Sequence, residues 1–471
     1  MASIVVTGGG IVGLLSAMLL ADDGHQVVVL ERDPDPPPPP DEAWGTWTRR
    51  GVSQFRLGHF LQPRFRREAD GALPRVVAAL AAAGALPLDI LGGVPTELTG
   101  GRWPGDEDLE ILTARRPVAE SVVAACAEAT PGLTVRRGTA VAGLTTGTEV
   151  LAGVPHVTGV RTETGEEMGA DLVVDATGRR SPLPDWLAAV GGRRPHEELE
   201  DSGFIYYGRH FRSADGSCPA IIGPLAHNHG SITALTLPAD NGTWGIVIVA
   251  SAGDVALRAL RDVDAWTAVM GSLPLAAHWL DGEPLEDRIQ MMAKIEDRHR
   301  AFVIDGRPVA TGVVAVADSW ACTNPSLGRG ISMGLMHAVA LRDTLRRTPG
   351  DDPAALAGAW EEATNDTVEP WYRATVAFDR HRLAEIDAEI KEEDYRPDDP
   401  DWDMAQGLGF AAGQDPACFR AFLRVVGVLE TPDEALARPG VREKVVALGD
   451  EWRNVAPFGP SRKELLAMVS T

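Results

Sequence analysis

The sequence predicts an α/β fold in which a parallel-sheet domain is interrupted by a second, mixed or antiparallel sheet and followed by a helical C-terminal region. Three observations lead to this prediction. An apolar run, a glycine-rich turn and a helical pattern follow one another near residue 8, and the same succession returns near residue 328. Between them, from 182 to 300, apolar residues alternate or run long, as in antiparallel strands. After residue 351 the patterns are mainly helical.

The first thirty-three residues have the pattern of a βαβ unit. An apolar run meets glycines spaced as GxGxxG and passes into a helical pattern, and a second apolar run ends in an acid eighteen residues after the last glycine. In chain order these features are Ser3–Thr7, then Gly8, Gly10 and Gly13, then Ile11–Asp22, then Gln26–Leu30 and Glu31. The pattern predicts a Rossmann-type domain.

Each glycine of this turn has its own physical reason. Gly8 permits a sharp turn, Gly10 lets the backbone approach a pyrophosphate, and Gly13 lets the helix pack closely on the strand. The N–H groups at the helix start, around Ile11 and Val12, carry a partial positive charge that attracts a diphosphate. An ordinary glycine-rich turn is the alternative, but strand, helix and acid in register favour a dinucleotide site.

Glu31 indicates which dinucleotide binds. At the carboxyl end of the second strand it can accept hydrogen bonds from a ribose, and its charge would repel the additional phosphate of NADP. We therefore expect an ADP-containing cofactor without a 2′-phosphate, either FAD or NAD.

The composition disfavours several kinds of partner. A net charge of −23 would repel nucleic acid and anionic membranes, and no apolar run has spanning length, so no membrane insertion is expected. The apolar N-terminus lacks a basic region and coincides with the nucleotide-binding strand, so we do not expect a cleaved signal. The cysteines have no metal-type or redox-type spacing, which predicts no metal site and suits free thiols in a cytoplasmic protein; they are Cys126, Cys218, Cys322 and Cys418.

A surface loop follows Glu31. The proline run 36–40 is too stiff for a helix or a central strand. Residues 47–59 are rich in arginine, aromatic residues and amides although the protein is acidic. Two interpretations stay open: the arginines pair with carboxylates, or the loop reaches over a cofactor or an anionic group.

The following region alternates helical and extended patterns. Helices are expected over 73–85 and within 111–129, where Pro117 suits the first turn of a helix. Strands are expected at 133–135, 139–144 and 157–162. The segment 167–175 leads into residues 172–178, which predict a buried strand that ends in Asp175 and a glycine turn.

Residues 182–300 predict a separate sheet layer. Strands are expected at 203–212, 231–237 and 244–250, and helices at 254–270 and 285–299. A hairpin-like pair, 301–304 and 309–316 around Asp305-Gly306, would return the chain to the first domain.

The second strand-to-helix succession runs from Asp318 through a turn with Pro325, Gly328 and Gly330 into a long helix over 331–346. Its start would be a second electropositive helix end, suited to an isoalloxazine carbonyl that gains negative charge on reduction. A plain strand-to-helix connection is the alternative. The remainder is mainly helical, with an acidic linker or lid at 392–401.

Three landmarks together resemble the FAD-dependent monooxygenases of the p-hydroxybenzoate hydroxylase superfamily. They are the GxGxxG turn with Glu31-Arg32, the segment DLVVDATG at 171–178, and Val316-Ala317-Asp318 followed by Pro325 and Gly328-Arg329-Gly330. The loop Arg50-Gly51-Val52-Ser53-Gln54, the helix start Arg115-Arg116-Pro117 and the Ala-Thr-Gly turn are most similar to the branch that contains styrene monooxygenases, polyene epoxidases and flavin-dependent halogenases.

The resemblance implies a domain organisation and a role for each landmark residue. A glutathione-reductase-like FAD domain would comprise 1–181 and 301–350, a substrate domain 182–300, and a helical region 351–471. The FAD pyrophosphate would be held by Gly8, Gly10 and Gly13 together with the helix start at Ile11 and Val12. On the adenosine side, Glu31 would bind the ribose, Arg32 would lie at the adenine side and Val141 would contact the adenine. Arg116 would bind the ribityl-phosphate region, and Asp318 would bind a ribityl hydroxyl. Gly328 and Gly330 would lie under the flavin pyrimidine, and Pro325 beside the edge where oxygen reacts. The family usually has glycine where this chain has Ala317.

The resemblance also implies an activity. Reduced FAD and O2 would form a C4a-hydroperoxide that inserts one oxygen atom, by epoxidation or hydroxylation, into an apolar aromatic or polyene substrate. No catalytic side chain is assigned, because the flavin carries the chemistry. The candidates for lining the substrate pocket are Tyr206, Tyr207, Arg209 and His210, of which strand alternation lets at best half point inward.

Other functions stay open. Halogenase relatives carry Trp-x-Trp-x-Ile-Pro, whereas the stretch beginning at Trp244 has one tryptophan and no proline. An FAD-dependent isoprenoid reductase and a non-catalytic flavin-binding partner protein are further alternatives. Electrons would come from NAD(P)H, directly or through a separate flavin reductase, and the branch resemblance favours the second route.

Overall fold

The nucleotide-binding part of the chain is built on a five-stranded parallel sheet. The computed structural model describes residues 1–49, 51–348, 352–449, 451–455 and 458–470. The strand order is β20-β9-β1-β2-β5, with bounds Val313–Ala315, Leu172–Asp175, Ser3–Thr7, Gln26–Leu30 and Leu133–Arg136. Neighbouring strands pair in parallel, for example Val5 with Val28 and Val173.

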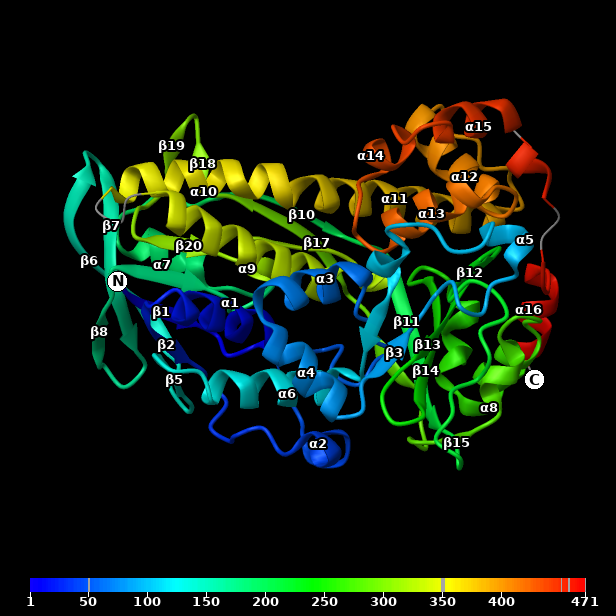
Figure 1. The fold of residues 1–471 in the computed structure, drawn as a ribbon, viewed down its shortest axis with the longest axis horizontal. Coiled ribbons are helices and arrows are strands. Elements are labelled where there is room, and N and C mark those ends of the chain that lie inside the picture. The colour runs from blue at the N-terminus through cyan, green and yellow to red at the C-terminus, as the bar shows by residue number, and fades with distance from the viewer. Residues whose placement is uncertain (50, 349–351, 450, 456–457, 471) are drawn as a thin grey trace.

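Alternating side chains of β1 bury against different layers. Ile4 and Val6 join a core with the helices on one face, whereas Val5 joins a core with a small sheet on the other. The helices are α1 (Ile11–Asp22), α3 (Pro63–Ala72), α4 (Pro74–Ala82), α6 (Arg116–Glu128) and α9 (Gly330–Arg347). The opposite layer contains β6 (Val141–Leu151), β7 (Val154–Thr162), β8 (Glu167–Gly169) and α7 (Leu183–Ala189). Figure 1 shows β6 to β8 at one end of the molecule.

A second sheet is antiparallel, as the sequence predicts. Its order is β12-β13-β14-β11-β15, with β16 also paired to β11, and the bounds are Ala226–His229, Ile232–Pro238, Thr243–Ser251, Phe204–Arg212, Glu283–Pro284 and Gln290–Met292. One face packs on α8 (Val263–Gly271) and α16 (Arg462–Val469), so the C-terminal end of the chain returns to this sheet (Figure 1). The other face looks toward α11 (Glu369–Lys391).

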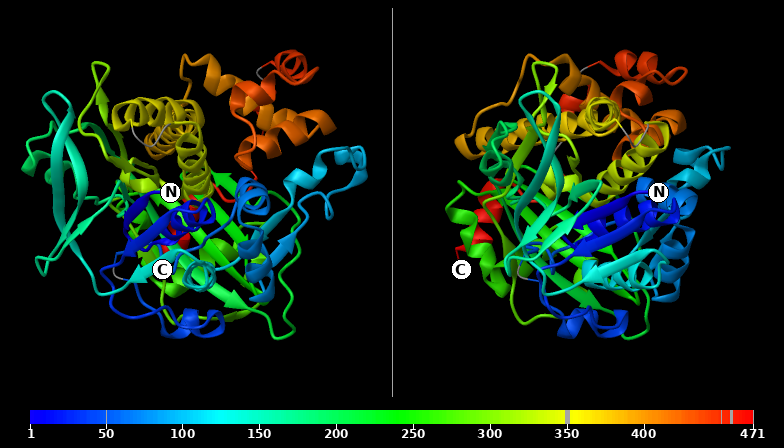
Figure 2. Two further views of the ribbon diagram at one scale, coloured as in Figure 1. Left: turned by 60° about the vertical axis from the view of Figure 1, so that its left-hand side comes forward. Right: turned by 90° about the vertical axis from the view of Figure 1, so that its left-hand side faces the viewer.

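The C-terminal region is helical, and four of its helices begin with a shared signal. Proline stands in the first turn and an acceptor side chain at the N-cap, namely Asp352, Asp399, Asp415 or Thr431. These four helices are α10 (Pro353–Thr367), α12 (Pro400–Ala412), α13 (Pro416–Val426) and α14 (Pro432–Leu436), and α15 (Val441–Leu448) follows them without this signal. Figure 2 shows α12 to α15 gathered on the side of the molecule away from β6 to β8.

Short elements connect these layers. They are α2 (Pro40–Thr46), β3 (Leu86–Leu88), α5 (Thr96–Thr99), β4 (Ile111–Thr113), β10 (His196–Asp201), β17 (Glu296–Ala301), β18 (Val303–Ile304), β19 (Arg307–Pro308) and β21 (Ala321–Cys322). In the part of the chain that the structure describes, no helix combines the length and the apolar composition needed to cross a bilayer.

The predicted fold class is confirmed, and the first βαβ unit has the bounds expected from the sequence. The helix predicted over 285–299 is wrong, because this segment contributes β16 and β17. Arg300 at the end of β17 is buried and donates to Glu197 on β10 and to the Ser319 carbonyl. Pairing with strands distant in sequence therefore determines the conformation of this charged segment.

Two other elements are divided differently from the prediction. The helix expected over 254–270 consists of a 3-10 turn, Ala256–Arg261, and then α8, whose start is capped by Asp262. The hairpin at Asp305-Gly306 joins β18 to β19, and both turn residues have positive φ. The strand that follows, β20, pairs in parallel with β9 instead of continuing the hairpin.

Candidate functional site

A cavity of about 2680 Å³ extends from the first glycine turn, past the second, to the face of the antiparallel sheet that looks toward α11. A pocket for one small molecule usually measures roughly 300–1,000 Å³. The cavity therefore has room for a dinucleotide and a second molecule beside it.

The three glycines of the first turn differ in what surrounds them. Gly8 has φ 101°, and a Cβ there would lie 2.5 Å from the Ala176 carbonyl oxygen. A Cβ on Gly13 would lie 2.1 Å from the Gly8 carbonyl oxygen, whereas one on Gly10 would meet no atom within 4 Å. The fold itself requires Gly8 and Gly13, while Gly10 leaves open space at the wall of the cavity.

This open space fits a diphosphate. Gly10 is the N-cap of α1 and no side chain caps the helix, so its first N–H groups are free to bind an anion. Gly10, Ile11, Val12 and Gly13 all line the cavity. The N-terminus of α1 thus offers the donors and the room that the pyrophosphate of a dinucleotide needs.

Glu31 is buried at the wall of the cavity and organises the turn. Its carboxylate accepts hydrogen bonds from the backbone N–H groups of Gly9 and Asp33, both at 2.9 Å, and from Arg49 at 2.8 Å. Glu31 and Arg32 both line the cavity. The predicted contacts of Glu31 with a ribose and of Arg32 with the adenine side stay predictions.

The loop 47–59 pairs one of its arginines with carboxylates and lines the cavity, while its predicted reach over a cofactor or an anionic group stays a prediction. Arg49 binds three carboxylates, those of Glu31, Asp33 and Glu120. The residues after it line the cavity; they are Gly51, Val52, Ser53 and Gln54. Arg50 lies outside the described residues.

Two further predicted cofactor residues line the same cavity. Arg116 begins α6, and its Nε donates to Glu120 Oε1 at 2.7 Å. Val141 begins β6. Their roles toward a ribityl phosphate and an adenine stay predictions.

The second turn presents Asp318 to the cavity. Burial raises the pKa of the Asp318 carboxyl, while Arg116 and Arg179 act in the opposite direction. The preceding Ala317 has φ 51°, and its N–H donates to His337 Nδ1 at 3.0 Å. A left-handed backbone favours glycine, which is the residue that the resemblance noted in the sequence leads us to expect at this position.

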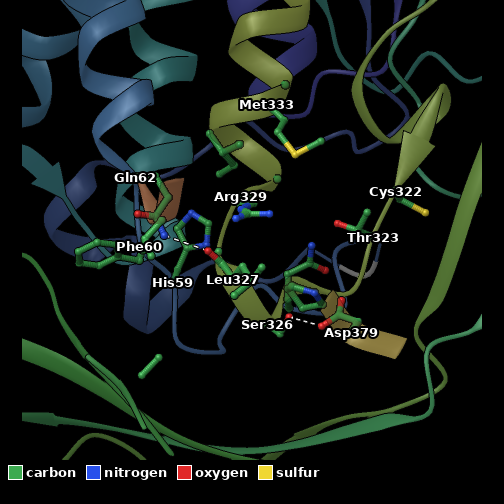
Figure 3. A pocket seen from close by; sticks show the side chains of 18 of the residues that line it. His59, Phe60, Gln62, Cys322, Thr323, Ser326, Leu327, Arg329, Met333 and Asp379 are labelled. Atoms are coloured by element: carbon green, nitrogen blue, oxygen red, sulfur yellow. Dashed lines mark hydrogen bonds between the residues drawn. The ribbon is translucent and has the colours of Figure 1, made fainter. Parts of the chain in front are cut away.

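The turn then leads into α9 along the cavity wall. Pro325–Leu327 forms a 3-10 turn that ends at Gly328, with φ 62°. Gln62 Nε2 donates to the Leu327 carbonyl at 2.9 Å and fixes the turn (Figure 3). Pro325, Gly328 and Gly330 line the cavity, so the structure brings both predicted helix starts to one space.

Of the four predicted substrate residues on β11, only Tyr206 lines the cavity. Tyr207 packs in the core behind the sheet, and Arg209 donates to the Glu286 carbonyl and lies over Phe211. His210 is buried against the Trp44 ring, at 4.5 Å between ring centroids. Strand alternation turns Tyr207 and Arg209 away from the cavity, and Trp44 of α2 covers His210.

A polar cluster beside Pro325 was not predicted from the sequence. Asp379, on α11, accepts from Ser326 Oγ at 2.7 Å (Figure 3). Asn324 Oδ1 accepts from the Tyr206 hydroxyl at 2.6 Å. Burial raises the pKa of Asp379 to about 7 and also raises that of Tyr206. Asn324 and Ser326 flank the predicted Pro325, a signal that could have found them, but nothing in the charged helix α11 distinguishes Asp379.

Arg329 is buried at the start of α9 in the same part of the pocket (Figure 3). It donates to Thr375 Oγ1 at 2.9 Å and lies over the Trp371 ring. Burial lowers its pKa to about 10, and Asp379 acts in the opposite direction. This guanidinium ties α9 to α11 across the wall of the cavity.

Comparison with known proteins places the chain among proteins of the same fold. No family model matches the sequence. Protein Rv3254 of Mycobacterium tuberculosis is 29% identical over 454 residues, which cover 91% of this chain and 90% of that protein.

Solved structures with low sequence identity share the architecture. A variant of PqsL from Pseudomonas aeruginosa matches with a TM-score of 0.59 and 18% identity, over 82% of this chain and 97% of its own. PyrE3, a Diels-Alderase of pyrroindomycin biosynthesis, matches with a TM-score of 0.59 and 17% identity, over 91% of this chain and 81% of its own. A variant of 2-methyl-3-hydroxypyridine-5-carboxylic acid oxygenase matches with a TM-score of 0.57 and 16% identity, over 82% of this chain and 93% of its own. These likenesses show the fold.

Proposed function

We propose that this protein binds FAD and is a flavin-dependent monooxygenase of an apolar organic substrate. The observation that carries the proposal is that two helix starts, at Gly10 and at Gly330, line one cavity together with Asp318. Similarity to PqsL, a probable FAD-dependent monooxygenase, and to the pyridine carboxylic acid oxygenase supports it.

The residues at these two turns fit an extended dinucleotide. The N–H groups from Gly10 to Gly13 would hold the diphosphate, and Asp318 would accept from a ribityl hydroxyl. The turn from Pro325 to Gly330 would lie along the ring system, with the N-terminus of α9 stabilising negative charge on it. Bound and reduced, FAD supplies the activation of O2.

The rest of the cavity is suited to an apolar substrate. The antiparallel sheet contributes Leu235, Val247 and Val249, and α13 contributes Phe419, Phe422 and Leu423. Such a lining excludes water from an oxygen-transfer reaction and binds aromatic or polyene surface by the hydrophobic effect. More specifically, we propose that the oxygen atom is transferred by epoxidation or hydroxylation, through a flavin C4a-hydroperoxide.

The test begins with the purified protein and added FAD. Binding should shift the flavin absorbance, and the anaerobically reduced complex mixed with O2 should show the transient absorbance of a C4a-hydroperoxide before oxidised flavin returns. A protein that takes up no FAD in either redox state refutes the proposal. Direct return to oxidised flavin refutes the monooxygenase assignment alone.

Experiments on the same FAD complex distinguish several alternative functions. Halogenated product on addition of bromide would identify a halogenase, and saturation of an isoprenoid double bond would identify a reductase. Similarity to PyrE3 over 91% of the chain favours one more candidate, a non-oxidative cyclisation in the same cavity, which would proceed without O2. Uptake of FAD with no reaction of any kind would indicate a flavin-binding partner protein.

Electron supply is a separate part of the proposal. The sequence has no second glycine-rich fingerprint for a nicotinamide cofactor. We expect reduced FAD to arrive from a separate flavin reductase. Mixing the FAD complex anaerobically with NADH or NADPH alone tests this, because rapid bleaching of the flavin would instead indicate a one-component enzyme.

A further inference from the structure

The cavity is larger than a dinucleotide alone requires. Its volume is about 2680 Å³, whereas a site for one bound organic molecule measures roughly 300–1,000 Å³. A cofactor of the largest size in that range therefore leaves roughly 1,700 Å³ for a second molecule. This space exceeds what a single aromatic ring with small substituents fills.

Helix α13 presents an apolar face to this space. Four apolar side chains at the spacing i, i+3, i+4 and i+7 form a stripe along the helix and line the cavity; they are Phe419, Phe422, Leu423 and Val426. None of the four is fully buried, and Val426 is 36% exposed. The fully buried apolar residues of α13, Cys418 and Ala421, pack instead in the core of the C-terminal helices. The stripe thus leaves apolar surface open to the cavity.

Two loops present apolar side chains to the same space. The loop before β12 contributes Ile221, Ile222 and Leu225, and Ile222 is 57% exposed. The loop between β3 and α5 contributes Ile90 and Val94. Figure 1 shows α5, α13 and β12 at the same end of the molecule. Exposed apolar surface gathered around one cavity is typical of a ligand-binding groove.

The stripe on α13 runs outward from the turn at Pro325 to Gly330. At the C-terminal end of α13, the Val425 carbonyl accepts from Arg329 Nη2 at 3.5 Å. At the other end, Pro416 lies against Gly100 beside α5, where a Cβ on the glycine would lie 3.2 Å from the proline ring. A helix rises about 1.5 Å per residue, so Phe419 lies about 10 Å farther along α13 from this turn than Val426.

The charges in this part of the cavity disfavour an anionic ligand. From residue 399 onward, the described residues line the cavity with four acids and one arginine; they are Asp399, Asp401, Asp433, Glu434 and Arg442. The whole protein also has a net charge of −23. A carboxylate or phosphate on the ligand would approach this excess of negative charge, whereas an uncharged molecule avoids the repulsion.

We propose that the substrate is a large, uncharged apolar molecule that extends from the turn at Pro325 along α13 to Phe419. This inference rests on the proposed function, because that turn is assigned to the flavin ring. Burial of apolar surface along the whole stripe supplies the binding free energy, and Phe419 is the residue that selects for length. The stripe is continuous with the cavity that contains both glycine turns, which favours a small molecule over a protein that covers α13 from outside.

The test uses the full-length protein with FAD added and three probes that share one ring. β-Ionone carries this ring with a short chain, retinol carries it with a longer polyene chain that ends in a hydroxyl, and retinoate ends that chain in a carboxylate. Energy transfer from tryptophan reports the binding of retinol and retinoate, and competition with retinol reports that of β-ionone.

Retinol should bind at least about tenfold more tightly than β-ionone, because its additional chain is buried along α13. It should also bind at least about threefold more tightly than retinoate. Equal binding of retinol and β-ionone, or binding of retinoate as tight as that of retinol, overturns the proposal. A stable dimer of the FAD complex that excludes retinol, detected by size-exclusion chromatography, overturns it as well, since a second copy would then cover the stripe.

Variants locate the preference for length. Phe419→Ser should lower the ratio of retinol affinity to β-ionone affinity about threefold or more, and Phe419→Leu, which keeps an apolar side chain, should retain most of it. Val446→Ser is the matched control, because this 62% exposed residue of α15 is not among the described residues that line the cavity. An unchanged ratio in Phe419→Ser overturns the assignment to Phe419.

Two features keep the result decisive. The probe comparison on the unaltered protein needs no variant, so it stands even where Phe419→Ser does not fold. FAD uptake is followed separately by absorbance, so a failure of the proposed function is distinguishable from a failure of this inference.

Discussion

Gly10 and Gly13 lie three residues apart, yet alanine at the two positions should have different effects. At Gly13 the methyl would meet the Gly8 carbonyl oxygen at 2.1 Å, so Gly13→Ala should lower the free energy of unfolding by about 1–3 kcal/mol or more. At Gly10 it meets only open cavity, so stability should change by less than about 0.5 kcal/mol. FAD affinity should nevertheless fall at least about tenfold, because the methyl occupies the diphosphate site.

Urea denaturation and FAD titration measure the two quantities. Gly10→Ala and Gly13→Ala serve as controls for each other. Unimpaired FAD binding by a folded Gly10→Ala protein would contradict the placement of the diphosphate.

Ala317 is held at φ 51°, a conformation that costs a non-glycine residue about 1–2 kcal/mol. Ala317→Gly removes this strain, but the greater backbone entropy of glycine in the unfolded chain offsets about 0.5–1 kcal/mol of the gain. We expect a net gain of about 0.5–1 kcal/mol in the free energy of unfolding, measured by urea denaturation. Ala315→Gly, at a buried strand position nearby, should instead destabilise the protein. Destabilisation by Ala317→Gly would show that the methyl contributes packing that outweighs the strain.

Asp379 should make stability depend on pH in a predictable direction. Burial raises its pKa from 3.8 to about 7 and Asp297 adds to this change, whereas Ser326, Asn324 and Arg329 oppose it. The folded state therefore keeps a proton that the unfolded state releases, and stability falls as pH rises between these values. Relative to Asp379→Asn, the parent should lose at least about 1 kcal/mol between about pH 4 and pH 7 and no more above that range. Urea denaturation at a series of pH values measures this difference, and parallel curves would contradict it.

At the scale of elements, local patterns could be predicted and distant pairings could not. β1, α1 and β2 have the expected bounds because strand, glycine turn and helix are determined by adjacent residues. The segment that forms β17 has a charged sequence without strand alternation, and it becomes a strand by pairing with β10, about a hundred residues earlier in the chain. No pattern within residues 285–299 contains that information.

Arg49 fastens the loop 47–59 to the parallel-sheet domain. It neutralises two buried carboxylates, Glu31 and Glu120, at 2.8 and 2.9 Å. Arg49→Met would leave both without this partner and should cost about 3–5 kcal/mol, measured by urea denaturation. Arg212→Met, which removes an exposed pair with Glu283, should cost less than about 1 kcal/mol. Similar losses in the two variants would show that the Arg49 network is effectively solvated.

At the scale of the whole molecule, the meeting of the two glycine turns at one cavity could be predicted, and the contribution of the C-terminal region to that cavity could not. The predicted glycines and Asp318 line one cavity because both turns lie at the carboxyl ends of parallel strands. Asp379 reaches the same cavity from a helix of the C-terminal region, whose docking is determined by tertiary packing alone. The helical content of that region could be predicted from the sequence, but its position relative to the cavity could not.

A buried ion pair attaches this C-terminal region to the rest of the protein. Arg420 on α13 donates to both oxygens of Asp106, at 2.7 and 2.8 Å, and also to the Thr99 and Gly101 carbonyls. The two charged side chains are 6% and 5% exposed, so Arg420→Ala leaves an uncompensated buried carboxylate and should cost about 3–5 kcal/mol.

The loss should be local, because α12 to α15 have a core of their own. Hydrogen exchange should accelerate at amides of α13 and of residues 96–109 in Arg420→Ala, while β1 and β2 keep their protection. Arg396→Ala, which removes an exposed pair with Asp394, should leave exchange unchanged. Since α13 also supplies Phe419, Phe422 and Leu423 to the cavity, Arg420→Ala should weaken binding of an apolar aromatic probe such as 1-naphthol, while FAD binding at the first turn persists. Equal acceleration across the whole chain would instead mean that the C-terminal helices and the parallel sheet unfold as one unit.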